Sequence, residues 1–172
     1  INDALAEHKI TSPFPIQAMT LPVALGGHDI IGQAKTGTGK TLGFGIPILN
    51  RVTSPKDEAF ATMPFAGKPQ ALAVAPTREL AVQVEESFQT YGKHTKLRST
   101  VVYGGVDIKQ QLPIVRGGVE ILVATPGRLL DLFERGKILL TGVEMLVLDE
   151  ADRMLDMGFI PDLERIFKLT PP

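Results

Sequence analysis

Residues 34–41 of the chain read Ala34-Lys35-Thr36-Gly37-Thr38-Gly39-Lys40-Thr41. They follow the apolar run Asp29–Ala34 and precede a helical pattern of apolar residues that extends to Leu49. This arrangement matches the phosphate-binding loop Gly-x-x-x-x-Gly-Lys-Ser/Thr, with Ala34 in place of the first glycine. Glycine lets the backbone curl until successive N–H groups point at phosphate oxygens, and the following helix adds the positive end of its dipole. We therefore predict a strand, a phosphate-binding loop and a helix, with the Lys40 ammonium on the phosphates and the Thr41 hydroxyl on Mg²⁺.

The alternation of apolar runs and helical patterns continues along the chain. Further short runs rich in Val, Ile and Leu are Ala71–Ala75, Ser99–Tyr103, Ile121–Ala124 and Met145–Leu148. Runs that are apolar at nearly every position are typical of strands covered on both faces, and helices between them favour a parallel order. We therefore predict an α/β domain with a parallel sheet flanked by helices on both faces, and a surface loop at residues 53–69.

The composition limits the class of protein. A chain of 172 residues is expected to form a single domain, spanning residues 1–172. It has no cysteine, which excludes a disulfide framework and a thiol nucleophile and fits the cytoplasm, where thiols stay reduced. Its net charge of −1 gives no general attraction to nucleic acid, and no apolar run approaches the length of a membrane span, so we expect no membrane partner. Because the chain begins at Ile1 inside a helical pattern, we expect it to be part of a longer protein.

Two carboxylates follow the last apolar run directly. Met145–Leu148 ends in Asp149 and Glu150, and ligands of parallel α/β sheets bind beyond the carboxyl ends of the strands. Buried acids are costly unless they face a cation. In an enzyme with a phosphate-binding loop, we expect Asp149 to hold Mg²⁺ through water and Glu150 to polarise the attacking water. Asp152 comes shortly afterwards, and its alternative, purely structural role would be to cap the next helix.

The chain contains both residues 34–41 and the run Asp149-Glu150-Ala151-Asp152. With these two motifs it resembles the first RecA-like domain of the DEAD-box ATP-dependent RNA helicases. The resemblance covers nearly the whole chain in the order of the family. Its other motifs are the Q motif at residues 11–17, motif Ia beginning Pro76-Thr77-Arg78, the doublet Gly104-Gly105, motif Ib at Thr125-Pro126-Gly127-Arg128, and the run that follows the DEAD motif, residues 153–159.

The resemblance implies a RecA-like P-loop NTPase fold, with ATP and Mg²⁺ as cofactors. Gln17 would read the adenine, and its amide carries the donor and acceptor that this edge requires. Residues 34–41 would bind the phosphates, Lys40, Asp149 and Glu150 would act in hydrolysis, and Asp152 would couple this domain to a second RecA-like domain. That domain, and the Ser-Ala-Thr motif of the family, are absent from residues 1–172. The chain alone is then expected to bind nucleotide weakly and to hydrolyse it barely.

Motifs Ia and Ib and the glycine doublet would bind the RNA backbone. In Pro76-Thr77-Arg78 and Thr125-Pro126-Gly127-Arg128, a helix starts after an apolar run, which offers free N–H groups, a hydroxyl and a guanidinium to a phosphate. The alternative for both is plain helix capping, and for Gly104-Gly105 it is a tight turn. Contacts of this kind carry little base specificity.

Two rival functions remain open at this level. An ATP-gated RNA clamp that turns over slowly would need the same residues, and multiple-turnover duplex release would argue against it. A P-loop enzyme that acts on DNA is the second, since the preference for RNA comes from the resemblance alone.

Overall fold

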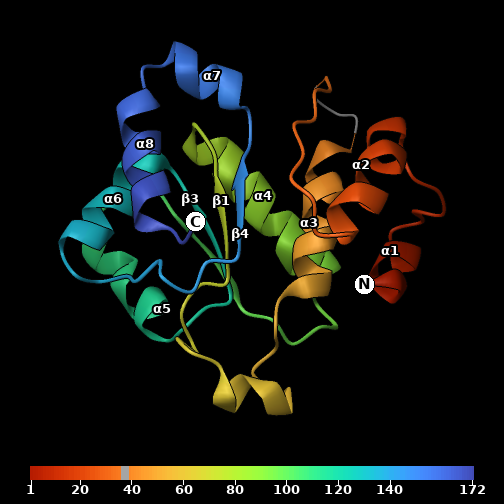
Figure 1. The fold of residues 1–172 in the computed structure, drawn as a ribbon, viewed down its shortest axis with the longest axis horizontal. Helices are drawn as coiled ribbons and strands as arrows, with labels where there is room; N and C mark the ends of the chain where they lie inside the picture. Colours follow the sequence, from red (N-terminus) through yellow and green to blue (C-terminus); the bar gives the residue numbers. More distant parts are fainter. Residues whose placement is uncertain (36–38) are drawn as a thin grey trace.

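The computed structural model describes residues 1–35 and 39–172, which form two layers of helices around one sheet (Figure 1). The helices and strands are α1 (Asn2–Glu7), α2 (Pro15–Leu25), α3 (Lys40–Arg51), β1 (Ala71–Val74), α4 (Arg78–Tyr91), β2 (Ser99–Val102), α5 (Leu112–Arg116), β3 (Ile121–Ala124), α6 (Pro126–Glu134), β4 (Met145–Leu148), α7 (Ala151–Asp156) and α8 (Ile160–Leu169), with short 3₁₀ helices η1 (Glu58–Thr62) and η2 (Ile108–Gln110). The predicted surface loop 53–69 contains η1.

The sheet is parallel, and its order places the carboxyl ends of the strands side by side. The described strands follow the order β2-β3-β1-β4, so β1 lies between β3 and β4. Ala71 is in register with Ile121 of β3 and with Met145 of β4. The turns that follow the four strands therefore meet at one edge of the sheet, with the turn after β1 in a central position.

Alternate strand residues face the two helical layers. Ala71 and Ala73 of β1 pack with α3 and α4, whereas Leu72 and Val74 point to the opposite face, which α5, α6 and α8 cover. The same alternation in β3 completes both cores. All eight residues of β1 and β3 are buried, which explains why their sequences are apolar throughout. The prediction of a parallel sheet with helices on both faces is confirmed.

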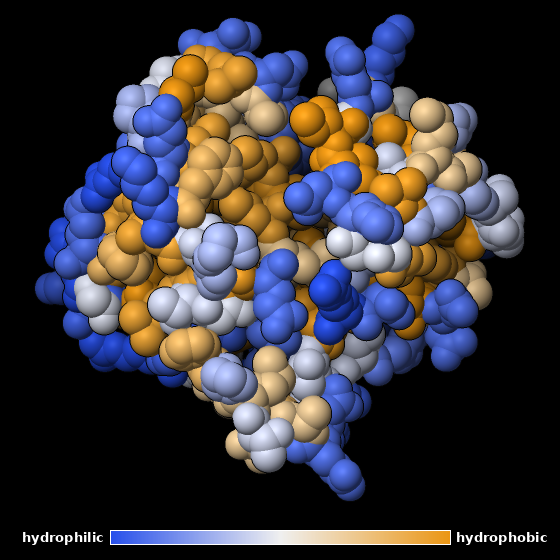
Figure 2. Space-filling model, in the orientation of Figure 1, coloured by the Kyte–Doolittle hydropathy of each residue, from blue (hydrophilic) through white to orange (hydrophobic). Residues whose placement is uncertain are grey.

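The predicted strand over Asp29–Ala34 was wrong. This segment has no strand assignment, and the Ile31 side chain is fully exposed. An apolar run becomes a strand only when a neighbouring strand supplies hydrogen-bond partners, and in the described sheet β4 pairs only with β1. The residues of β4 are accordingly half-buried, and hydrophobic surface (orange) lies open on this face of the molecule (Figure 2).

Glu85 of α4 is a buried carboxylate with a consequence for stability. Its Oε1 accepts hydrogen bonds from Gln89 Nε2 at 2.7 Å and from Ser99 Oγ at 2.9 Å, whereas its buried Oε2 has no partner in the described residues. Burial raises the pKa of Glu85, and these two hydrogen bonds oppose the shift. The folded state therefore holds this proton more tightly than the unfolded chain does. Protonated Glu85 therefore favours the folded state relative to ionised Glu85. This contribution to stability is fully present below the unfolded pKa and is lost as the pH rises through the folded pKa.

We therefore expect Glu85→Gln to stabilise the protein more at pH 8 than at about pH 4.5, near the unfolded pKa of glutamate. The gain in the free energy of unfolding of Glu85→Gln over the wild type should be larger at pH 8 than at pH 4.5, by up to about 1.4 kcal/mol for each unit by which the pKa is raised. Urea unfolding at both pH values measures it, with the exposed neighbour Glu86→Gln as the matched control. An equal effect of Glu85→Gln at the two pH values would contradict the assigned cost of the buried charge.

Candidate nucleotide site and adjoining turns

Lys40 and Asp149 lie together although more than a hundred residues separate them in the sequence. Lys40 is the first residue of α3, and Asp149 directly follows β4. The Lys40 Nζ lies 3.5 Å from Asp149 Oδ1. The structure thus brings the lysine of the predicted phosphate-binding loop to the predicted metal-binding carboxylate.

Gly39 precedes α3 in a conformation that only glycine adopts readily. It is the N-cap of the helix, with a φ of 78°. A Cβ at this position would lie 2.3 Å from Gln17 Nε2 and 2.6 Å from Phe14 Cδ2, so the contact with α2 requires the absence of a side chain.

Gln17 connects the Q motif to this loop. It is buried in α2, where its Nε2 donates to the Gly39 carbonyl at 2.9 Å and its Oε1 accepts from the Phe14 N–H at 3.1 Å. Both ends of the amide are therefore engaged within the chain. The structure places Gln17 directly against the loop that the sequence assigns to phosphate.

Asp149 is a buried charge with incomplete pairing. Burial raises its pKa, whereas the ammonium of Lys40 opposes the shift. Its Oδ2 is buried and has no hydrogen-bond partner in the described residues. An unpaired carboxylate oxygen is costly in a protein interior, so this oxygen is suited to receive a cation or a water molecule that a cation holds.

Glu150 has a strained backbone. Its φ and ψ are both 51°, in the left-handed region that non-glycine residues rarely occupy, at a cost of about 1–3 kcal/mol. It is the N-cap of α7, and its Oε2 accepts a hydrogen bond from Arg153 Nη1 at 3.3 Å. Strain of this kind is common at functional sites, where the surrounding structure fixes the direction of a side chain.

A hollow of about 440 Å³ lies between the predicted phosphate-binding loop and the run that contains Glu150 and Asp152. Its lining residues are Ala34, Lys35, Lys40, Glu150, Asp152 and Arg153, and its volume lies in the range of ligand pockets. Asp152 is in the first turn of α7, whose N-cap is Glu150, so the alternative in which Asp152 caps this helix does not hold. The expected phosphate-binding residues Thr36, Gly37 and Thr38 fall outside the described residues.

The available donors suit Mg²⁺ better than a metal held by protein side chains alone. Within the described residues no group of three or more His, Cys, Asp or Glu side chains is arranged to hold a metal. Mg²⁺ commonly takes one or two carboxylates and completes its shell with water and substrate phosphates. The unpaired oxygen of Asp149 fits that pattern.

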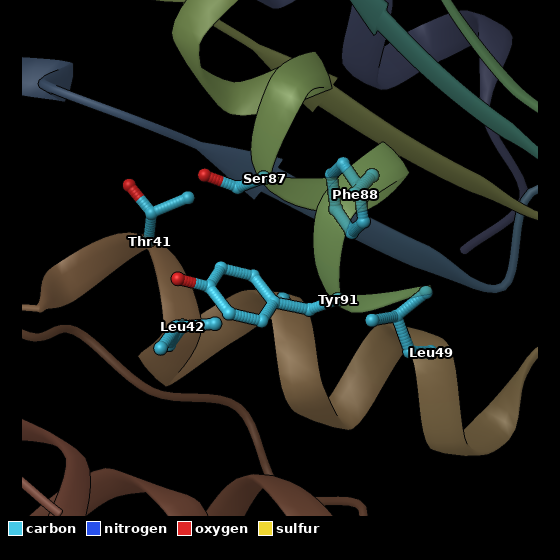
Figure 3. Close-up of a pocket in the computed structure, with 7 residues that line it drawn as sticks. Thr41, Leu42, Leu49, Ser87, Phe88 and Tyr91 are labelled. Carbon is cyan, nitrogen blue, oxygen red and sulfur yellow. The ribbon is translucent and has the colours of Figure 1, made fainter. Parts of the chain in front are cut away.

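Thr41, the other expected Mg²⁺ ligand, lies beside a different hollow. This space of about 10 Å³ between α3 and α4 is lined mainly by Leu42, Leu49, Phe88 and Tyr91, and it is large enough for about one water molecule. Figure 3 shows the Thr41 hydroxyl on the α3 side and Ser87 on the α4 side. The structure therefore brings Lys40, Asp149 and Glu150 together, but it places Thr41 toward α4.

The turns after the other three strands hold the residues expected to bind RNA. Thr77 caps α4, with its Oγ1 accepting from the Leu80 N–H at 3.3 Å, and Thr125 is the N-cap of α6. The capping interpretation thus describes Thr77. Pro76 and Pro126 are buried, whereas Arg78, Gly104, Gly105 and Gly127 are exposed. Arg128 is half-buried. Because β2, β3 and β1 are neighbours, these turns form one continuous edge.

Sequence reasoning missed two residues at this edge, Tyr103 and Gln111. The Tyr103 ring lies under the Arg78 guanidinium, with 4.6 Å between the guanidinium carbon and the ring centre. Gln111 is buried, and its Nε2 donates to the Tyr103 carbonyl at 3.0 Å. Arg128 donates to Gln111 Oε1 at 3.1 Å. No feature of the sequence distinguishes Gln111 from its neighbour Gln110.

The fold and these sites define a helicase domain. The DEAD/DEAH box helicase family matches residues 14–172, and the chain belongs to this family. Its four-stranded parallel sheet and flanking helices form a RecA-like domain.

Relatives with known names agree with this assignment. The chain is 48% identical over 157 residues to the DEAD-box ATP-dependent RNA helicase CshA of Bacillus cereus, and 46% identical to the ATP-dependent RNA helicase CshA of Limosilactobacillus reuteri. Each match covers 91% of this chain but only 28% and 30% of those proteins. A crystal structure of a hypothetical ATP-dependent RNA helicase from Sulfolobus tokodaii is similar with a TM-score of 0.84 and 38% identity, over 98% of this chain and 46% of that one. None of the described helices has the length and hydrophobicity needed to cross a membrane.

Proposed function

We propose that this chain is the ATP-binding domain of an RNA-dependent ATPase that separates short RNA duplexes or remodels RNA–protein complexes in the cytoplasm. The observation that carries the proposal is the approach of Lys40 to Asp149 beside the strained Glu150. The three residues line or adjoin one hollow at the carboxyl edge of the sheet, next to the turns after β1, β2 and β3.

The roles in hydrolysis follow from position. Lys40 binds the β- and γ-phosphates of ATP, and the N–H groups at the start of α3 add further donors. Glu150, with its direction fixed by the αL backbone, orients the water that attacks the γ-phosphate in line. Asp149 and Thr41 would hold Mg²⁺, which neutralises charge on the phosphates when it is bound. Thr41 would need to turn from its present position beside α4.

Gln17 is proposed to select adenine. Because its amide already pairs with Gly39 and Phe14, adenine would have to replace or share these hydrogen bonds. Binding of the base would then change the hydrogen bond at the Gly39 carbonyl, at the start of the phosphate-binding helix. Gln17 would thus connect recognition of the base to the geometry of the loop.

The exposed and half-buried groups at the turns after β1, β2 and β3 are proposed to bind the RNA sugar-phosphate backbone. Arg78 supplies a charge, Gly104 and Gly105 allow close approach, and Thr125 and Gly127 stand at the start of a helix. Phosphate contacts fix position without reading bases, so we expect little sequence specificity.

The whole protein is proposed to contain a second RecA-like domain, because the chain spans less than a third of the length of the curated relatives that it matches. An arginine finger from such a domain contributes about 10³–10⁵ to the rate in well-studied phosphoryl-transfer enzymes. The chain alone would therefore bind ATP weakly and hydrolyse it very slowly. Asp152, exposed at the rim of the hollow, is proposed to couple the two domains.

The test is RNA-stimulated hydrolysis by the full-length protein. We expect single-stranded RNA to stimulate release of phosphate from ATP, with GTP a poor substrate and DNA a poor activator. Gln17→Ala should bring the kcat/KM values for ATP and GTP close together. Gln17→Ala also removes the hydrogen bond to Gly39, which would lower the kcat/KM for ATP and for GTP in parallel. The ratio of these two values therefore reports recognition of the base.

Three results would change the assignment. Equal stimulation by DNA would favour an enzyme that acts on DNA. Hydrolysis that stops after a single turnover while RNA stays bound would favour an ATP-gated clamp, and duplex release over many turnovers would exclude one. An unchanged ATP to GTP ratio in Gln17→Ala would remove Gln17 from base recognition.

A further inference from the structure

We propose that Tyr103 is a positioning residue for RNA binding, because its ring holds the Arg78 guanidinium in place at the edge of the sheet. Gln111 and Arg128 fix the backbone of Tyr103 and so complete the support. The inference rests on the proposed contact of Arg78 with an RNA phosphate.

The first step is the contact between Arg78 and Tyr103. The guanidinium carbon lies 4.6 Å from the centre of the ring, within the distance of a cation–π interaction. Arg78 is exposed at the start of α4, and a long exposed side chain would otherwise sample many rotamers. A cation–π contact needs no hydrogen-bond acceptor, so the N–H donors of the guanidinium remain available for a phosphate. The ring thus orders the cation without consuming its hydrogen-bonding capacity.

The second step is the support of Tyr103 by Gln111. Tyr103 follows β2 immediately, at a position where the strand has ended. The buried amide of Gln111 supplies the backbone hydrogen bonds at this position. Its Nε2 donates to the Tyr103 carbonyl at 3.0 Å, and its Oε1 accepts from the Tyr103 N–H at 3.3 Å. This pair of bonds replaces the partner that a neighbouring strand would provide. The direction in which the ring leaves the backbone is therefore fixed.

The third step is the pair of hydrogen bonds by which Arg128 connects Gln111 to Val106, the residue that follows Gly104-Gly105. Its Nη1 donates to Gln111 Oε1 at 3.1 Å, and its Nη2 donates to the Val106 carbonyl at 2.8 Å. Gly104 and Gly105 lie between Tyr103 and Val106, whose backbone groups are held in this way. Among the described residues, no atom beyond their chain neighbours lies within 4 Å of where their Cβ atoms would be. The turns after β1, β2 and β3 are therefore connected through side chains before RNA binds.

This arrangement also indicates what the ring does not do. The face of Tyr103 that carries the Arg78 guanidinium is covered, so a base cannot stack on that face. The ordered cation favours the sugar-phosphate backbone as the ligand. Groups fixed in advance lose less conformational entropy on binding, which is the expected advantage of the Tyr103 support.

The experiment measures affinity of the full-length protein for a fluorescently labelled single-stranded RNA, in the presence of a non-hydrolysable ATP analogue, over a series of salt concentrations. Tyr103→Leu should weaken binding about two- to fivefold, the range of an exposed cation–π contact. Tyr103→Phe keeps the ring and should restore most of the affinity. Arg78→Ala should weaken binding further and lower the slope of log affinity against log salt by about 0.7, the value for one phosphate contact on a single strand. In the Arg78→Ala background, Tyr103→Leu should have no additional effect.

Each failure has a separate signature. If Arg78→Ala weakens binding and Tyr103→Leu does not, the positioning role is wrong and the proposed RNA contact stands. If Tyr103→Leu weakens binding equally with and without Arg78, Tyr103 acts on RNA by another route and the inference is overturned. If Arg78→Ala changes neither affinity nor slope, the proposed RNA contact of Arg78 itself fails.

A second variant guards against loss of folding. Gln111→Met is uncharged and similar in size, and it leaves the ring in place. It removes both hydrogen bonds to the Tyr103 backbone and the one from Arg128, which keeps its hydrogen bond to Val106. We expect it to weaken RNA binding only when Arg78 is present, with ATP affinity and the melting temperature recorded alongside. An equal effect without Arg78 would count against the inference.

Discussion

With glutamine in place of Glu150, ATP hydrolysis by the full-length protein should fall at least about a hundredfold, whereas the affinity for ATP should change less than about threefold. Glutamine has the same shape and can still accept the hydrogen bond from Arg153 through its amide oxygen. It cannot take up a proton or polarise a water as a carboxylate does. Lys40 and Asp149 remain in place, so the groups proposed to bind the phosphates and Mg²⁺ are unchanged.

Single-turnover hydrolysis and equilibrium binding of a fluorescent ATP analogue separate the two effects. Glu144→Gln is the matched control, because it makes the same change at an exposed residue next to the opposite end of β4. Unchanged turnover in Glu150→Gln would remove Glu150 from the reaction. Loss of binding instead of turnover would mean that its carboxylate supports the bound nucleotide.

Lys40→Ala is expected to weaken ATP binding by about a hundredfold, because it removes a charge-assisted contact with the phosphates in a partly buried site. The same change leaves Asp149 buried without its cation. We therefore expect the free energy of unfolding without nucleotide to fall as well, by about 1–3 kcal/mol. An effect on binding alone, with unchanged stability, would mean that the ion pair contributes nothing to the fold.

Calorimetric titration of ATP and urea unfolding measure these two quantities. Lys56→Ala serves as the control, since it removes an exposed lysine near the 3₁₀ helix η1. ATP affinity within about threefold of the wild type in Lys40→Ala would overturn the assignment of the phosphate-binding loop.

The sequence predicted all four strands of the described sheet, including the half-buried β4, and failed at one further run. Ile121–Ala124 is a strand as predicted, because its continuous apolar pattern reflects cover on both sides. Asp29–Ala34 contains two adjacent isoleucines but also Asp29 and Gln33, and it has no pairing partner in the described sheet. Hydropathy reports the preference of a segment for burial, whereas strand formation also depends on which other segment lies beside it. The hydropathy pattern of a single segment carries no information about its neighbour in the fold.

At the candidate site, the sequence predicted residues better than it predicted their contacts. Placing Lys40 and Asp149 in one site was possible because a phosphate-binding loop and an acid at the carboxyl end of a parallel strand serve the same ligand in P-loop enzymes. The engagement of Gln17 with Gly39, and the support of Tyr103 by Gln111, depend on side-chain directions between elements distant in sequence. No periodicity marks such a pair. Arg98 and the fully buried Glu120, which join the amino-terminal ends of β2 and β3, were missed for the same reason.

The half-buried position of β4 has a practical consequence for work on this chain alone. Within the described sheet, one side of β4 is paired with β1 and the other has no strand beside it. Unpaired backbone groups next to apolar side chains form a template for strands of other molecules. Self-association of the isolated domain would therefore begin at the strand that leads to Asp149, the proposed metal ligand, and aggregation at high concentration would suppress the proposed nucleotide binding without any change in the residues of the site.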